Sequence, residues 1–158
     1  MQLEILLRSD APESVDTPML ALLIPEGPWV PSLAPVDRAT DGALARVLRS
    51  GDFKGKRDEA TLLHPPGYAG RILLVGLGKA ADVDPARLRR AAGMVAKRAR
   101  SLGIPDAALH VPGEVLAPLD DRAAGRALAE GIGQGAWQFA ELKEPPKEPK
   151  GPLGAVAI

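Results

Sequence analysis

The sequence contains no cysteine, and this absence removes several kinds of chemistry at once. Without thiols the chain can form no disulfide bond, no cysteine nucleophile and no cysteine-ligated zinc site. Histidine is scarce too: His64 and His110 are the only two, far apart in the chain, and each is expected to play an ordinary structural role on a strand. No G-x-S-x-G nucleophile motif is present either. The sequence therefore predicts no catalytic residue and no metal ligand within this chain.

Long apolar runs, aromatic residues and net charge are lacking as well. No window approaches the roughly 18 uninterrupted apolar residues of a transmembrane helix, so no membrane partner is expected. Aromatic residues make up 3% of the chain, which predicts an aliphatic core. Basic and acidic residues both number 20, so the overall charge gives no argument for nucleic acid. The first residues carry neither a basic region nor a small-residue cleavage site, and a cytoplasmic location is expected.

The clearest feature that is present is the stretch RILLVGLGK, residues 71–79. A continuous apolar run bounded by turn residues predicts a strand that is buried on both faces. Gly76 and Gly78 are expected to turn the chain at its end. A long helical pattern then opens after Asp84, which is a suitable N-cap. Strand, glycine turn and helix together predict half of an α/β unit.

The other periodic segments alternate between strand and helix patterns. Strands are expected at residues 3–7, 19–24, 61–64, 107–111 and 153–158, and helices at about 36–49, 85–102 and 121–139. Pro25 is expected to stop the second strand, and Gly51 and Gly103 to end the first two helices. Four glycines in the last helix predict a close approach to another backbone. Trp29, Trp137 and Phe139 are expected to be packing anchors.

The domain organisation follows from composition. Residues 1–143 are expected to form the α/β domain, residues 144–152 a connection rich in proline and lysine, and residues 153–158 a final strand of the same domain. Because few natural chains end on an apolar strand, we expect the natural protein to continue beyond Ile158, which would leave its further domain outside this sequence.

The glycine turn is the first candidate binding site. Gly76, Gly78 and Ala81 loosely satisfy the G-x-G-x-x-G/A pattern of dinucleotide-binding loops. However, the helix begins only at Pro85, and the next strand ends without the acid that would bind a ribose. A tight structural turn is the favoured interpretation. Gly76, Gly78 and Lys79 are retained as candidate residues for binding an anion or a nucleotide.

The helix at residues 85–102 is the second candidate. It carries six arginines and lysines and no acid, and such a helix could follow a phosphate backbone. Arg87, Arg90, Lys97 and Arg98 are the candidate residues for binding DNA or another nucleic acid. The favoured alternative is a solvated face whose charges meet acidic residues elsewhere in the chain or in a partner subunit.

Four segments resemble one known family in the right order. They are GDFKGK at residues 51–56, RILLVGLGK at 71–79, AAG at 91–93 and ALAEGIGQGAWQF at 127–139. Over about residues 20–158 the chain resembles the N-terminal domain of the leucine aminopeptidase (cytosol aminopeptidase) family. The segment KRDE at residues 56–59 departs from the family, which usually has a glycine before the acid.

The resemblance implies a single three-layer α/β/α sandwich with a mixed sheet of about six strands, similar to a macrodomain. It also implies a hexameric parent enzyme whose C-terminal catalytic domain holds two divalent metals, zinc or manganese. The family's signature NTDAEGR belongs to that domain and is absent here. No catalytic or metal-binding residue can therefore be carried over to this chain.

Two functions are accordingly expected. The first is that of a non-catalytic domain, serving assembly or regulation, in a cytoplasmic leucyl-type metallo-aminopeptidase that removes N-terminal residues from peptides. The alternative is a module that binds nucleic acid or a nucleotide, through the basic helix at 85–102 or the loop at 76–79.

Overall fold

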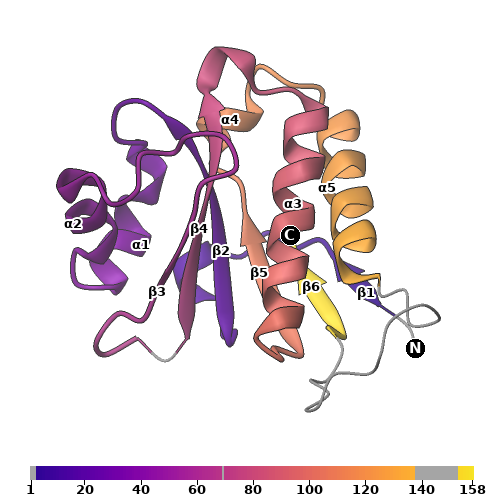
Figure 1. Ribbon diagram of the computed structural model, residues 1–158, viewed down its shortest axis with the longest axis horizontal. Helices are drawn as coiled ribbons and strands as arrows, with labels where there is room; N and C mark the ends of the chain where they lie inside the picture. The colour runs from indigo at the N-terminus through magenta and orange to yellow at the C-terminus, as the bar shows by residue number, and fades with distance from the viewer. Residues whose placement is uncertain (1–2, 69, 138–152) are drawn as a thin grey trace.

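One mixed sheet of six strands organises the chain (Figure 1). The computed structural model describes residues 3–68, 70–137 and 153–158. The strands are β1 (Glu4–Leu6), β2 (Met19–Glu26), β3 (Ala60–Leu63), β4 (Arg71–Lys79), β5 (Asp106–His110) and β6 (Ala155–Ala157). They lie in the order β1-β6-β5-β2-β4-β3, and only β3 at the edge is antiparallel to its neighbour. The predicted mixed sheet is confirmed.

The second strand is longer than expected because it passes through Pro25. The register between β2 and β4 shifts here: Ile24 pairs with Gly76 and Glu26 pairs with Lys79, so β4 carries one extra residue opposite Pro25. At such an irregularity the regular ladder is interrupted, so Pro25 need not donate a ladder hydrogen bond and is tolerated within the strand. The expectation that Pro25 stops the strand is therefore wrong.

The helix expected at residues 36–49 is in fact two short helices. The helix α1 (Ala34–Ala39) ends before a turn, and α2 (Ala43–Ser50) begins after it. Asp41 and Gly42 in this turn adopt positive φ angles of 53° and 75°. The buried Thr40 hydroxyl donates to the carbonyl of Val36 at 2.9 Å, which fixes the end of α1.

The two long helices match their predicted starts. The helices are α3 (Pro85–Ser101) and α5 (Asp121–Ala136), with a single turn, α4 (Gly113–Leu116), that the sequence did not predict. Asp84 accepts a hydrogen bond from the amide of Arg87 at 2.8 Å, as the predicted N-cap. Asp120 caps α5 in the same way through the amide of Ala123. Phe139, the predicted end of α5, lies outside the described residues.

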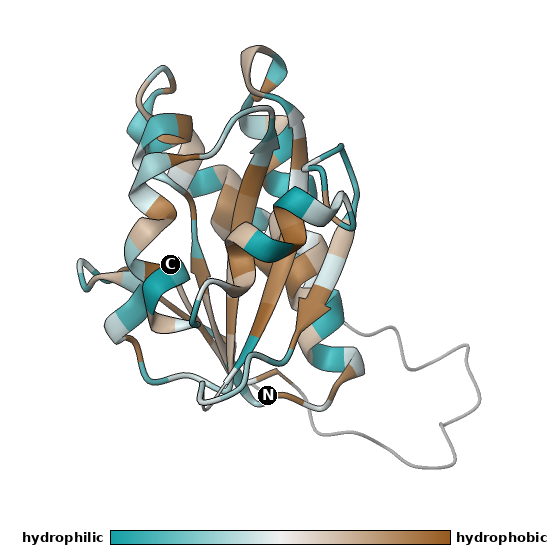
Figure 2. Cartoon of the chain, turned by 90° about the vertical axis from the view of Figure 1, so that its left-hand side faces the viewer, coloured by the Kyte–Doolittle hydropathy of each residue, from teal (hydrophilic) through white to brown (hydrophobic). Residues whose placement is uncertain are grey.

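The helices form a layer on each face of the sheet, which confirms the three-layer sandwich. Neighbouring strand residues alternate between two buried clusters, as expected for a sheet covered on both faces. Leu20, Leu22 and Leu74 pack on the side of α1 and α2, whereas Leu23 and Val75 pack on the side of α3 and α5. In Figure 2 the brown, hydrophobic segments are concentrated on the central strands, and the teal, hydrophilic segments lie mainly on the surrounding helices and loops.

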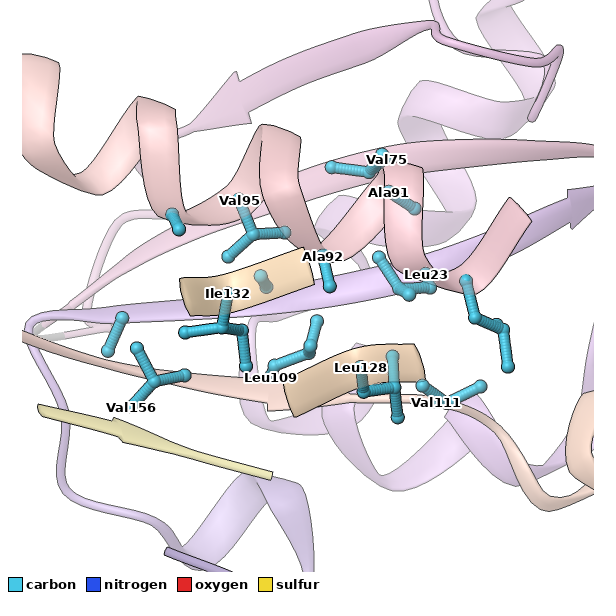
Figure 3. Close-up of a cluster of buried hydrophobic side chains, with 14 of the residues drawn as sticks. Leu23, Val75, Ala91, Ala92, Val95, Leu109, Val111, Leu128, Ile132 and Val156 are labelled. Carbon is cyan, nitrogen blue, oxygen red and sulfur yellow. The ribbon is translucent and has the colours of Figure 1, made fainter. Parts of the chain in front are cut away.

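The larger cluster lies between the sheet and the helices α3 and α5 (Figure 3). The helices contribute Ala91, Ala92 and Val95 from α3 and Leu128 and Ile132 from α5. These side chains lie next to Leu23, Val75, Leu109 and Val156 of the sheet and Val111 just after β5. Alanines make up most of the buried face of α3, so bulky side chains are few where this helix packs.

None of the described helices is long and apolar enough to cross a membrane.

Glycines bring α3 and α5 into backbone contact. A Cβ atom at Gly131 would collide with the carbonyl of Arg89, and one at Gly135 with the carbonyl of Gly93. The predicted close approach of α5 to another backbone is therefore confirmed at these two positions. Gly125 and Gly133 face open space and have no such role.

Candidate functional site

The loop predicted to bind an anion is part of a strand. The strand β4 continues through Gly76 and Gly78 to Lys79, and the chain turns only afterwards, in the short 3-10 helix η3 (Ala80–Asp82). The expectation that the two glycines turn the chain is wrong, because both lie within β4; Gly76 accommodates a neighbouring backbone, and Gly78 accommodates the side chain of Arg87. A Cβ atom at Gly76 would overlap the carbonyl of Lys56. Gly78 has a positive φ of 78°, which a glycine adopts without strain.

The backbone donors of these glycines are already engaged. The amide of Gly76 donates to the carbonyl of Glu59 at 2.7 Å, and the amide of Gly78 donates to the carbonyl of Gly55 at 2.9 Å. An anion would have to displace these bonds before it could use either amide. Lys79 is exposed at the end of the strand. Anion or nucleotide binding by Gly76, Gly78 and Lys79 stays a prediction.

Several cations of α3 are held within the chain. Arg90 donates to Asp58 at 2.6 Å, and this hydrogen bond lowers the pKa of the Asp58 carboxyl. Arg89 donates to Glu130 of α5 at 2.9 Å. The pKa of Glu130 is lowered by hydrogen bonds from Arg126 and then from Arg89. Arg89 and Arg90 therefore meet acidic residues elsewhere in the chain, as the favoured interpretation of the basic helix expected.

The four nucleic-acid candidates divide into two pairs. Arg87 donates to the carbonyl of Leu77 at 2.9 Å, which ties the first turn of α3 to the end of β4, and Arg90 is paired with Asp58. Lys97 and Arg98 are exposed, and within the described part of the chain neither forms an ion pair. Nucleic-acid binding by this helix stays a prediction, with Lys97 and Arg98 as its available cations.

A groove of about 530 Å³ separates α3 from the edge strand β3. Leu62, Leu73, Val75 and Met94 give it an apolar floor, and Lys97, Arg98 and Arg100 supply cations at its wall. The groove exists because α3 covers β4 but leaves the inner face of β3 partly open. Arg100 also donates to the carbonyls of Gly135 and Trp137, at 3.1 and 2.5 Å.

A second hollow lies where the helical connections switch from one face of the sheet to the other. The chain leaves β2 towards α1 on one face, but leaves β4 and β5 towards α3 and α5 on the other. In open α/β sheets, ligands bind at such a point, beyond the carboxyl ends of the strands. Here the hollow measures about 260 Å³. Its lining consists of Pro25, Glu26, Pro28, Trp29, Val30, Pro31, Ala80, Glu114, Val115 and Pro118.

The chemistry of this hollow differs from that of a phosphate site. Trp29 and the prolines form apolar walls, and Glu26 and Glu114 are its charged members. Ser32 donates to Glu114 from its amide at 3.0 Å and from its hydroxyl at 2.5 Å, and the hydroxyl contact lowers the pKa of Glu114. Two carboxylates would repel a phosphate, so the hollow is suited to an apolar or cationic group.

The two tryptophans are more exposed than the sequence predicted, and Trp29 lines the hollow. Trp29 was expected to be a packing anchor, yet it is 38% exposed and forms a wall of this hollow. Trp137, also expected to anchor packing, is 64% exposed. The only available signal at Trp29 was its position between Pro28 and Pro31, in a loop of the kind that is typical of surface segments.

The histidines do not come together. His64 is exposed after β3, whereas His110 is half-buried at the end of β5. Burial lowers the pKa of His110, and the nearby carboxylates of Glu13 and Glu114 partly oppose this effect. Among the residues that the structure describes, no three histidine, aspartate or glutamate side chains lie close enough to hold a metal ion.

Comparisons with known proteins give consistent results. A family model described as the cytosol aminopeptidase family, N-terminal domain, matches residues 24–146. The cytosol aminopeptidase of Pseudomonas aeruginosa is 35% identical to this chain over 150 residues. That match covers 93% of this chain and 30% of the relative, so the chain spans about a third of the length of the curated relatives it matches.

The solved structures show the same fold at lower sequence identity. A mutant of tomato leucine aminopeptidase superposes with a TM-score of 0.81 and 21% identity, covering 99% of this chain and 32% of the tomato chain. The macrodomain of Mycobacterium tuberculosis DarG gives a TM-score of 0.63 and 16% identity, covering 97% of this chain and 95% of the macrodomain. The expected likeness to a macrodomain is therefore confirmed at the level of the fold.

Proposed function

We infer the function of this chain from its membership of a family: the chain belongs to the cytosol aminopeptidase family, as its N-terminal domain. We propose that it is the non-catalytic domain of a cytoplasmic leucyl-type metallo-aminopeptidase that removes N-terminal residues from peptides. The parent protein would carry its catalytic domain after this one. This domain would serve assembly, within a homo-hexamer, or regulation.

One observation carries the proposal. The family model that matches residues 24–146 describes an N-terminal domain, and the matched relatives are about three times as long as this chain. A domain at the start of a long enzyme contributes to catalysis directly only if it supplies residues to the reacting site. The sequence of this chain lacks the signature that the family resemblance places in the catalytic domain.

The metal centre of such an enzyme does not fit the residues described here. Two zinc or manganese ions need several carboxylate or histidine ligands that converge within a few ångströms. In the described ranges no such group of three side chains exists. We therefore assign the metal, and the metal-activated water that it supplies, to the remainder of the parent protein, and we assign no catalytic step to this chain.

The test compares this chain with the parent protein. Both are assayed with a leucyl peptide substrate in the presence of added manganese, before and after chelation. We expect turnover with the parent and none with the 158-residue chain. Turnover that follows the purified short chain through successive columns would refute its non-catalytic role. A parent without aminopeptidase activity would refute the assignment of the enzyme.

The assembly role needs its own measurement. If residues 1–158 support the oligomer, a parent protein that lacks them should sediment as a smaller species than the intact parent. If the truncated parent kept both its activity and the number of subunits of the intact parent, the assembly proposal would be contradicted. Only a regulatory role would then be left.

A further inference from the structure

The end of β1 exposes an apolar residue that continues a buried row. Leu3 and Ile5 point to the face covered by α3 and α5, where both are partly buried. Side chains two residues apart on a strand share a face, so Leu7 continues this row. Leu7 is nevertheless 81% exposed, the highest value among the large apolar residues that the structure describes.

The pairing with β6 shows that Leu7 still belongs to the sheet. The amide of Ile158 donates to the carbonyl of Leu6 at 2.8 Å, and the amide of Arg8 donates to the carbonyl of Ile158 at 2.9 Å. These two bonds are those of a parallel ladder in which Ile158 lies opposite Leu7. Neighbouring strands lie about 4.8 Å apart, so the Leu7 and Ile158 side chains stand side by side on one face. Ile158 is only partly buried.

The next residue of the parent protein would therefore emerge directly beside Leu7. In the proposed function, on which this step rests, roughly two thirds of the parent lies beyond this chain. Because β1 is an edge strand, no further strand of the described sheet covers it. Burying apolar surface is favourable, so a segment that covered the exposed Leu7 side chain would be held there by the hydrophobic effect.

We propose that the segment that directly follows Ile158 in the parent protein packs an apolar side chain against Leu7 and Ile158, and so begins the interface with the rest of the parent. Leu6 supports the same location: it is 44% exposed on the opposite face of β1, next to Ala157. The apolar corner is therefore open on both faces at the point where the chain leaves the domain. The Arg8–Asp10 ion pair, with an N···O distance of 2.6 Å, forms its polar border.

The experiment uses thiol labelling, for which this chain is suited because it contains no cysteine. Leu7→Cys is introduced into the 158-residue chain and into the parent, and the labelling rate of the peptide that carries residue 7 is followed by mass spectrometry. Ala60→Cys is the matched control, because Ala60 is exposed on β3 at the opposite edge of the sheet. We expect labelling at position 7 to be at least about tenfold slower in the parent than in the short chain, and labelling at position 60 to be similar in both.

Each other outcome overturns the proposal in a recognisable way. Equal labelling rates at position 7 in the parent and the short chain would show that nothing covers this corner. Protection that disappears on dilution of the parent would indicate a second copy as the occupant. Equal protection at positions 7 and 60 would indicate general shielding of the domain. Aminopeptidase activity of the parent is measured in parallel, so that failure of the enzyme assignment and failure of this interface are separate results.

Discussion

The contact between α3 and α5 predicts opposite effects for the same substitution at two nearby positions. Alanine in place of glycine in a helix interior favours folding by about 0.5–1 kcal/mol, because the folded glycine gives up more backbone freedom. Gly133→Ala should show this gain, since nothing lies within 4 Å of a Cβ atom at Gly133. Gly131→Ala has the same gain in helix propensity but a different neighbourhood.

At Gly131 the new methyl group has no room. A Cβ atom there would overlap the carbonyl of Arg89 and lie 3.0 Å from the Cβ of Ala92. The carbonyl belongs to the backbone of α3, so relief requires the two helices to separate. Overpacking of this kind costs about 1–3 kcal/mol or more. After the propensity gain is subtracted, we expect Gly131→Ala to destabilise the domain by about 1–2 kcal/mol.

The two variants are compared by urea and thermal unfolding of the 158-residue chain. For a domain of this size, 1 kcal/mol corresponds to roughly 2–4 °C in Tm. The Tm should therefore rise by a few degrees in Gly133→Ala and fall by a few degrees in Gly131→Ala. Because both positions lie in α5, their propensity terms largely cancel in the comparison. Shifts of the same sign and size would refute the backbone contact between the helices.

Two further predictions concern a helix cap and a histidine. Asp84→Ala should lower the free energy of unfolding by about 1 kcal/mol, because the amide of Arg87 loses its 2.8 Å acceptor. Urea titration measures this change, and an unchanged midpoint would show that the cap contributes nothing. His110 has a pKa lowered by burial, so the unfolded chain binds its proton first as the pH falls. Stability should therefore decline on acidification from about pH 6.5 downward. His110→Gln should flatten this decline, and an identical pH profile in the variant would contradict the assignment.

The sequence was most informative where a pattern reflects local physics. Asp84, Pro85 and the apolar stripe that follows predicted α3 almost to the residue, since capping and amphipathic spacing act over short distances. The break between α1 and α2 was missed, although Asp41-Gly42 is a recognised turn dipeptide. Its signal was outweighed by the apolar spacing on either side.

The misses at the candidate sites have a different origin. Gly76 was interpreted as a turn because its partner, the backbone of Lys56, is distant in the sequence. The pairing of Arg89 with Glu130 joins two helices, so the neutralisation of the basic helix could be named only in general terms. The hollow beside Trp29 is assembled from three segments, at or after the ends of β2, β4 and β5, that meet only in the folded chain. None of these contacts leaves a periodic or local pattern that a reading of one sequence could detect.

The position of β6 has a consequence for folding during synthesis on the ribosome. Since β6 lies between β1 and β5, the first strand to be synthesised cannot join the sheet until residues 155–157 have been made. At about 5–20 residues per second, the edges of β1 and β5 stay open for many seconds while the rest of the core can already form. Sequence-distant parallel pairing of this kind slows folding and exposes strand edges. The nascent domain should therefore depend on protection by chaperones for longer than a meander sheet of equal size.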